Sequence, residues 1–315
     1  MSSESAFIEA LRAIATDAAA RGLADDAAVL ELGSINLVLT KDMLVEGVHY
    51  LAGDPPEDVA WKLVAVNLSD LAAKGARPRA GLLGFMLGDA EWDRAFADGL
   101  GTALAAFGLP LLGGDTVAAA GSARVLSLTA IGEAAGPVPS RSGAHPGDDL
   151  WMSGSIGDAG AGLAILRGDI EGDEALVRRY RAPRPRLEAG QALAGTVSAM
   201  MDVSDGLLID ASRLGHASGL GITIALDQLP LSPAYLAALG DDRTARLRAA
   251  TAGDDYELLF TAPAEGRLRI STLAEELGLP LTRIGACAAG AGLKLADAEG
   301  SVPLPGSLGY EHDAS

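Results

Sequence analysis

The stretch WKLVAVNLSDLAAKGARP, residues 61–78, decides how the first half of this chain is built. Its residues are small or apolar on nearly every side, which predicts a long helix over residues 57–74 that ends at Gly75 and Pro78. Asp70 lies inside this apolar run. An isolated buried carboxylate is costly unless it is paired, hydrogen-bonded or bound to a metal. The rest of the chain must therefore supply a partner for Asp70.

The segments around this helix predict a mixture of strands and helices in two domains. The spacing of Phe7, Leu11 and Ile14 predicts an opening helix capped by Gly22. Residues 134–149 are rich in Pro and Gly, so we expect an α/β domain over residues 1–136 and a second α/β or α+β domain over residues 137–315. Strands are expected at 35–40, 81–87, 123–133, 150–154, 221–226, 256–262 and 281–286, and further helices at 91–107, 158–166, 186–199 and 205–218.

Composition narrows the classes of protein to which the chain can belong. The 315 residues are 49% hydrophobic, and 42 acidic against 24 basic residues give a formal charge of −18. A charge of this sign disfavours nucleic acids and anionic membrane surfaces as partners. The N-terminus lacks the pattern of a signal peptide, and no uncharged apolar run is long enough to span a bilayer. The single cysteine, Cys287, excludes an internal disulfide, so we expect a cytoplasmic protein.

Acidic residues beside apolar segments recur along the whole chain. An Asp next to Gly is usually a turn or capping residue, so each position taken alone has a structural explanation. Their joint occurrence, with Asp preferred to Glu and with Thr40, Thr116 and Ser204 nearby, indicates a site for a hard cation with oxygen ligands, for which Mg²⁺ is the obvious candidate. The candidates are Asp25, Asp26, Asp42, Asp70, Asp115, Asp202, Asp205, Asp254, Asp255 and Glu257.

Familiar catalytic motifs are missing from the sequence. It has no P-loop, kinase-type glycine-rich loop, dinucleotide-binding fingerprint, nucleophile elbow or zinc-type spacing of Cys and His. The four histidines show no ligand spacing, and His49 alone lies within a run of candidate site residues. The common nucleotide-binding folds are therefore disfavoured.

The motifs taken together resemble the thiamine-monophosphate kinase family of the aminoimidazole ribonucleotide synthetase superfamily. The resemblance covers nearly the whole chain and rests on ADDAAVL, LTKDMLVEGVHY, WKLVAVNLSDLAAKGARP, LLGGDT, RSGAHPGDDLWMSGSIGDAGAGL, MDVSDGLLID, AGDDYELLF and GYEH. It implies an α/β domain that forms a homodimer, a C-terminal α+β domain, and an active site in the cleft between them. It also implies Mg²⁺- and ATP-dependent phosphorylation of thiamine monophosphate to thiamine diphosphate, the last step of thiamine diphosphate biosynthesis.

The same resemblance assigns roles to individual residues. It implies several Mg²⁺ ions per site and direct transfer without a catalytic side chain. His49, Asp254 and Tyr310 would contact the thiamine phosphate. Lys41 stands where relatives carry a hydroxyl residue that helps to bind a metal, so we expect that contact either to come from a backbone carbonyl or to be replaced by a direct contact of the lysine with phosphate. The implied metal ligands are Asp26, Thr40, Asp42, Asp70, Asp115, Asp202 and Asp205, and the implied ATP contacts are Gly114, Asp115, Arg141 and Ser204.

Two other functions stay open at this stage. An ATP-dependent ligase or cyclase of the same superfamily would release inorganic phosphate, and an acidic metal-binding module without activity would show no metal-dependent affinity for nucleotide. Selenophosphate synthesis is less consistent with the sequence, because no cysteine lies near the N-terminus.

Overall fold

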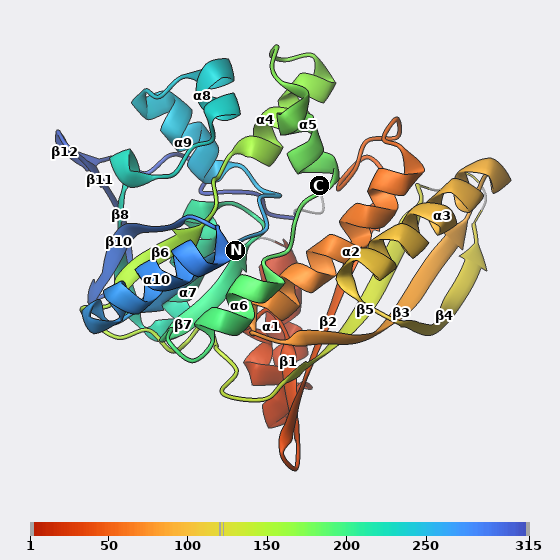
Figure 1. The fold of residues 1–315 in the computed structure, drawn as a ribbon, viewed down its shortest axis with the longest axis horizontal. Helices are drawn as coiled ribbons and strands as arrows, with labels where there is room; N and C mark the ends of the chain where they lie inside the picture. Colours follow the sequence, from red (N-terminus) through yellow and green to blue (C-terminus); the bar gives the residue numbers. More distant parts are fainter. Residues whose placement is uncertain (1–2, 120, 122, 313–315) are drawn as a thin grey trace.

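The computed structural model describes residues 3–119, 121 and 123–312, and its fold is built on two β-sheets (Figure 1). The first sheet has the strand order β1-β2-β5-β3-β4. Neighbouring strands are antiparallel except for the parallel pair β3 and β4. Its strands are β1 (Ala28–Leu32), β2 (Ile35–Val45), β3 (Arg77–Leu87), β4 (Leu111–Ala118) and β5 (Val125–Ala134).

The second sheet comes from the second half of the chain, in the order β12-β11-β8-β10-β6-β9-β7. Its strands are β6 (Asp149–Ser153), β7 (Ala199–Val203), β8 (Leu220–Ala225), β9 (Glu257–Ala262), β10 (Leu281–Ala289), β11 (Gly292–Asp297) and β12 (Gly300–Val302). Strands β6, β7 and β9 are buried along their whole length, because helices or other segments cover both faces of the sheet there.

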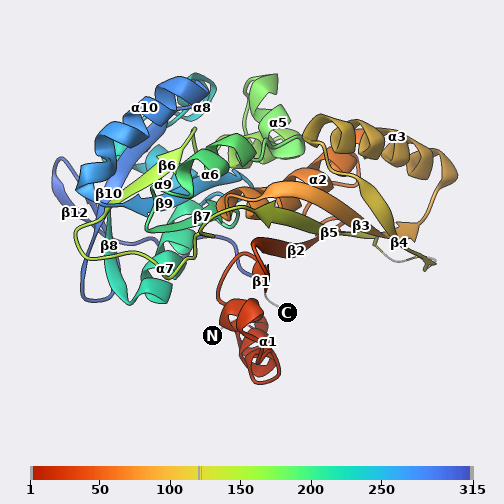
Figure 2. The same ribbon diagram turned by 60° about the horizontal axis from the view of Figure 1, so that its bottom comes forward.

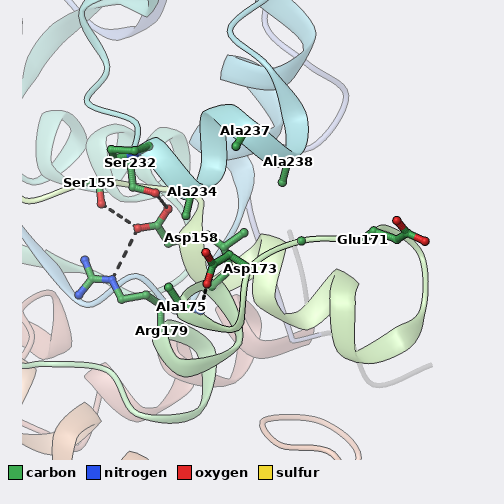
Figure 3. A pocket seen from close by; sticks show the side chains of 13 residues that line it. Ser155, Asp158, Glu171, Asp173, Ala175, Arg179, Ser232, Ala234, Ala237 and Ala238 are labelled. Atoms are coloured by element: carbon green, nitrogen blue, oxygen red, sulfur yellow. Dashed lines mark hydrogen bonds and ion pairs between the residues drawn. The ribbon is translucent and has the colours of Figure 1, made fainter.

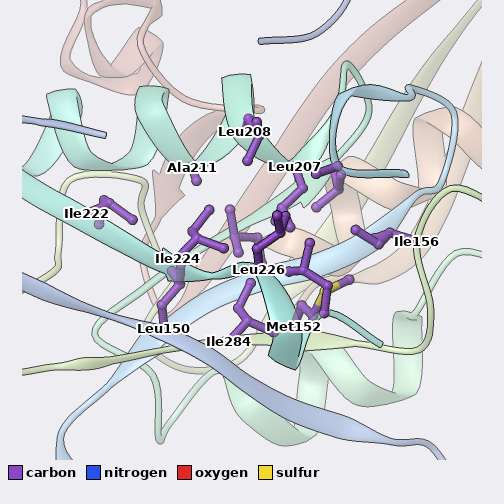
Figure 4. Packing of buried hydrophobic residues seen from close by; sticks show 14 of the residues in the cluster. Leu150, Met152, Ile156, Leu207, Leu208, Ala211, Ile222, Ile224, Leu226 and Ile284 are labelled. Carbon is purple, nitrogen blue, oxygen red and sulfur yellow. The ribbon is translucent and has the colours of Figure 1, made fainter. Parts of the chain in front are cut away.

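Helices surround this second sheet. They are α4 (Asp158–Arg167), α5 (Glu174–Arg181), α6 (Leu187–Leu193), α7 (Leu207–Ser218), α8 (Pro233–Leu239), α9 (Arg243–Thr251) and α10 (Arg267–Leu277). Figure 4 shows Leu207, Leu208 and Ala211 of α7 packed over the side chains of the sheet, including Ile222 and Ile224. This apolar core holds the end of β7 and the turn that follows it in a fixed position.

Helix α2 (Pro56–Ala73) lies between the two halves of the molecule. Figure 2 shows α2 and α3 (Ala90–Phe107) on one side of the first sheet and α1 (Ser3–Arg12) beyond the other side. Proline suits the first helical position, and the acidic side chains of Glu57 and Asp58 stabilise the N-terminal turn. The helix is buried on nearly every side because it packs on β2 and β5 and also on α6 and β7. Asp70, near its C-terminal end, therefore lies at the junction of both halves.

Two predicted helices end earlier than expected. The opening helix ends at Arg12, not at Gly22, and Ala18–Leu23 forms a separate 3₁₀ element in which Arg21 and Gly22 have φ of 48° and 65°. Arg21 is held there by Asp25 at 2.6 Å and by two carbonyl groups more than 100 residues away. The helix predicted over 186–199 ends at Leu193, because the backbone N–H of Ser198 donates to the carbonyl of Thr261 as the chain enters β7.

Several elements had no strong local pattern. Strands β1, β4, β11 and β12 and helices α5, α8, α9 and α10 were not predicted, whereas the strand predicted over 35–40 is present and extends to Val45. Among the described residues, no helix combines the length and the apolar character needed to cross a bilayer.

Candidate functional site

Three carboxylates meet where the two halves of the chain join. Asp26 lies in the loop before β1, Asp70 on α2 and Asp202 on β7, and each offers an oxygen within 4.8 Å of the others. Thr40 of β2 donates its hydroxyl to Asp70, and Ser69 donates to Asp202 at 2.6 Å. Four segments far apart in the sequence therefore build one cluster of oxygen ligands, which we call the carboxylate trio with its hydroxyl partners.

The carboxylates of this cluster repel one another when they are charged. Burial raises the pKa of Asp70 well above its usual range, and the nearby Asp42, Asp202 and Asp26 raise it further. Burial, followed by the charge of Asp26, also raises the pKa of Asp202. Burial, and then the charges of Asp205 and Asp26, raise the pKa of Asp42 of β2 to about 6. A cation placed among these oxygens would favour the charged forms of the carboxylates. The apolar residues of α2 offer Asp70 no such partner.

Two basic side chains already contact Asp26. Arg141 donates from Nε to one carboxylate oxygen at 2.8 Å, and the Nζ of Lys74 lies 2.6 Å from the other. Lys74 is completely buried and also contacts Asp25 and the carbonyl of Met200. Arg141 is among the residues predicted from the sequence, whereas Lys74 is not. A lysine one helical turn after Asp70, at the end of an apolar helix, was the signal that could have identified it.

The turn between β7 and α7 places Ser204 and Asp205 beside the trio. Their backbone N–H groups both donate to Asp210 at 3.1 Å, and Arg213 pairs with the carboxylates of Asp205 and Asp210. Burial raises the pKa of Asp210 to about 6, although the charge of Arg213 opposes this shift. Asp210 and Arg213 thus fix the conformation of the β7–α7 turn. The sequence predicted Ser204 and Asp205 of this turn as site residues, but not Asp210 or Arg213.

Gly114 and Asp115 lie away from the carboxylate trio within one chain. Both belong to β4, the edge strand, and the register places Met43, Ser127, Gly84 and Asp115 in one row across the sheet. Asp115 is therefore three strand spacings from β2, about 14 Å at roughly 4.8 Å per strand. The row also puts it on the face opposite α2, where Lys41 donates to Ser127 at 3.1 Å. The amine of Lys41 thus points away from the trio.

The three predicted substrate contacts lie close together. The Nδ1 atom of His49 accepts the backbone N–H of Val45 at 3.0 Å, and its ring centroid is 5.3 Å from that of His312. The His312 ring lies 4.9 Å from the ring of Tyr310, whose backbone N–H donates to the carbonyl of Asp205. Burial, and then the nearby His312, lower the pKa of His49.

Asp254 joins this group from the loop before β9. Its backbone N–H donates to the carbonyl of Ser204 at 2.7 Å, which sets it directly beside the β7–α7 turn. Its carboxylate pairs with Lys62 of α2 at 2.9 Å. Lys62 was not predicted from the sequence, because its partner is 192 residues away.

A separate cavity of about 830 Å³ lies between α4, α5 and α8, and no predicted site residue lines it (Figure 3). Its buried carboxylate, Asp158, accepts hydrogen bonds from Ser155 at 2.8 Å and Ser232 at 2.6 Å and lies 3.6 Å from Arg179. These partners satisfy the carboxylate, so its arrangement is explained by packing between the helices.

Comparison with known proteins relates both halves of the chain to one family. The family described as AIR synthase related protein, N-terminal domain, matches residues 24–134, and the corresponding C-terminal domain matches residues 145–297. The chain is 40% identical over 305 residues to the thiamine-monophosphate kinase of Caulobacter vibrioides, covering 94% of this chain and 86% of that protein.

Solved structures give the same relationship. The structure described as AaThiL complexed with AMPPCP and TMP superposes with a TM-score of 0.83 and 30% identity, covering 97% of this chain and 96% of that one. The thiamine-monophosphate kinase of Stenotrophomonas maltophilia K279a gives a TM-score of 0.78 and 39% identity, covering 91% and 93% of the two chains.

Proposed function

The chain belongs to the thiamine-monophosphate kinase family, within the AIR synthase related proteins, and from this premise we propose that it uses ATP to phosphorylate thiamine monophosphate to thiamine diphosphate, the last step in making that cofactor. The observation that carries the proposal is the carboxylate trio at the junction of the two halves. ATP and a phosphate monoester are both anions, so aligning them requires positive charge. An acidic chain obtains that charge by binding cations.

The ligands of the site fit Mg²⁺. Its donors are carboxylate and hydroxyl oxygens, and burial together with mutual repulsion raises the pKa of Asp42, Asp70 and Asp202. Bound Mg²⁺ would neutralise the phosphoryl oxygens during transfer. We assign several Mg²⁺ ions to the junction of the two halves, where ATP binds as the second substrate. Their ligands are Asp26, Thr40, Asp42, Asp70, Asp202 and Asp205, with Asp115 added as described below.

The protein's own groups bind and orient the nucleotide. Arg141 reaches the trio from residues that follow the first sheet, and Ser204 lies in the β7–α7 turn, so we assign both to the phosphates of ATP. We place the domain boundary between residues 136 and 137, since the strands of the first sheet end at Ala134 and those of the second begin at Asp149. The cleft between the domains is then the site of transfer.

The acceptor needs no catalytic base. A phosphate monoester has a second pKa of about 6 and presents an anionic oxygen at neutral pH. His49 could have served as a base, but its Nδ1 accepts the N–H of Val45, so in the neutral ring Nε2 carries the proton and can only donate. This geometry favours direct in-line transfer, with His49, Asp254 and Tyr310 orienting the acceptor and no phosphorylated enzyme residue.

A homodimer would complete the site. The face of the first sheet opposite α2 exposes apolar side chains, among them Met43 at 48% and Val117 at 55%, and Leu112 of the same edge strand is 69% exposed. Such a surface is typical of a subunit interface. We propose that a second copy covers it and brings Gly114 and Asp115 to the metal and ATP site of its neighbour, because one chain keeps them about 14 Å away from β2.

The test is direct. Incubation with Mg²⁺, ATP and thiamine monophosphate should give thiamine diphosphate and ADP in equal amounts. Release of inorganic phosphate in step with ADP would indicate a ligase or cyclase, and binding of Mg²⁺ without metal-dependent affinity for ATP would indicate a module without activity. We assign the reaction to the cytoplasm, in line with a single buried cysteine, Cys287, which cannot form an internal disulfide.

A further inference from the structure

We infer that Lys62 is a positioning residue for the acceptor: its buried amine holds the carboxylate of Asp254 where it accepts a hydrogen bond from the aminopyrimidine of thiamine monophosphate. The inference rests on the proposed function and names the residue that prepares the non-phosphate half of the acceptor site. Lys62 lies on α2, two helical turns before Asp70, and is only 2% exposed. A buried lysine needs a counter-charge and hydrogen-bond acceptors.

Three protein groups surround the Lys62 amine. Its Nζ donates to Asp254 at 2.9 Å and to the carbonyl of His49 at 3.0 Å. It also lies 3.9 Å from the centroid of the Tyr180 ring, which forms a cation–π contact. Because Lys62 is only 2% exposed and its amine already contacts these three groups, it does not bind the acceptor directly. It acts through the groups it holds, and two of them, His49 and Asp254, are the residues assigned to the acceptor.

Asp254 keeps the capacity to bind a ligand. Lys62 occupies one carboxylate oxygen and the Tyr256 hydroxyl, at 3.0 Å, occupies the other. A carboxylate offers about four acceptor positions, so about two remain. The side chain is 28% exposed, in contrast to the 2% of Lys62. An N–H donor from a ligand can therefore reach it, and a hydrogen bond to an ionised acceptor is stronger than one between neutral groups.

The backbone here is held in an unfavourable conformation. Asp254 has φ of +70° and Tyr256 has φ of +51°, in the left-handed region that non-glycine residues rarely adopt. Between them, Asp255 turns inward and accepts the backbone N–H of Gly157 at 2.8 Å. Strain of this kind persists where the surroundings impose it, and it clusters at binding sites. The conformation brings the Tyr256 hydroxyl to the carboxylate of Asp254, which in turn contacts Lys62.

The ligand chemistry follows from the two ends of the site. The carboxylate trio and its cations take the phosphate, whereas Asp254 offers only acceptor positions and negative charge. Thiamine monophosphate carries, beyond its phosphate, an exocyclic amine on its pyrimidine and a cationic thiazolium ring. Both suit an ionised carboxylate, and the amine supplies the N–H donor.

The test compares Lys62→Met with Lys294→Met, which removes an exposed lysine of β11. In full-length protein with Mg²⁺, we expect Lys62→Met to raise KM for thiamine monophosphate roughly ten- to hundredfold, since one partner of a buried charge pair is lost. KM for ATP should change by less than about twofold. Lys294→Met should behave as wild type. Equal changes in both KM values, or wild-type kinetics with only a lower melting temperature, would overturn the inference.

A double variant covers the case in which Lys62→Met does not fold. The double variant Lys62→Met/Asp254→Asn leaves no unpaired buried charge. If Lys62 acts through Asp254, its KM for thiamine monophosphate should match that of Asp254→Asn within about twofold, because coupled residues are not additive. A further tenfold rise would show that Lys62 acts independently and would refute the inference. Wild-type product formation in the same assay tests the proposed function separately.

Discussion

Replacing Asp42 by asparagine should stabilise the metal-free protein and lower turnover with Mg²⁺. Carboxylates crowded into one buried site destabilise the fold, but they also bind the cations. The pKa of Asp42 is raised from 3.8 to about 6 by burial and by Asp205 and Asp26. A difference of about two pKa units between the folded and unfolded chains corresponds to about 3 kcal/mol. Because the folded chain has the higher pKa, the resulting destabilisation is absent below about pH 4 and complete above about pH 6. Asparagine removes the charge, and with it this destabilisation.

In the presence of a chelator, we therefore expect Asp42→Asn to be more stable than wild type by up to about 3 kcal/mol at pH 8 and by roughly half as much at pH 5. Turnover with saturating Mg²⁺ should fall by orders of magnitude. The variant lacks a carboxylate that holds a cation, and the cation supplies positive charge to the phosphates. Chemical denaturation followed by circular dichroism at both pH values, together with the thiamine diphosphate assay, measures both effects.

Asp169→Asn is the matched control, since it neutralises an exposed carboxylate after α4. It should change neither stability nor turnover. The reasoning would be refuted if Asp42→Asn were less stable than wild type at pH 8 without metal, or if it kept near-normal turnover. The first result would mean that burial and the neighbouring carboxylates do not destabilise the charged form of Asp42, and the second that Asp42 is not a metal ligand.

Further predictions concern the other ligands, the assembly and the acceptor. Asp70→Asn and Asp115→Asn should each cut turnover by orders of magnitude while the circular dichroism spectrum stays that of wild type; near-normal rates in both would contradict the metal assignment. Sedimentation at micromolar concentration should give about twice the 31.9 kDa of one chain. Leu112→Glu should return the mass to that of one chain and lower turnover with it, and a fully active monomer would exclude a shared site. Free thiamine should not be phosphorylated under conditions that convert thiamine monophosphate, because its alcohol needs a base; efficient formation of thiamine monophosphate from thiamine would count against direct transfer.

Local sequence patterns predicted the elements that carry strong local signals. The helix predicted over 57–74 is α2, Pro56–Ala73, because its apolar run and the Gly75 and Pro78 that follow act within a few residues. The N-terminal helix was predicted too long, since the contacts that hold Arg21 in a left-handed conformation come from Val138 and Pro139. Strand β4 was missed because LLGGDTVA is rich in glycine and its pairing with β3 is not encoded nearby.

The sequence by itself determined which residues carry the chemistry: an aspartate inside an apolar helix, and acidic motifs whose order and spacing resemble one kinase family. The tertiary structure alone decided which of them meet. It joined Asp26, Asp70 and Asp202, placed Asp115 three strand spacings from β2, and paired Lys62 with an aspartate 192 residues away. The physical reason is that helix periodicity and turn chemistry act over a few residues, whereas electrostatic contacts depend on distance in space, and strand order and packing of the core set that distance.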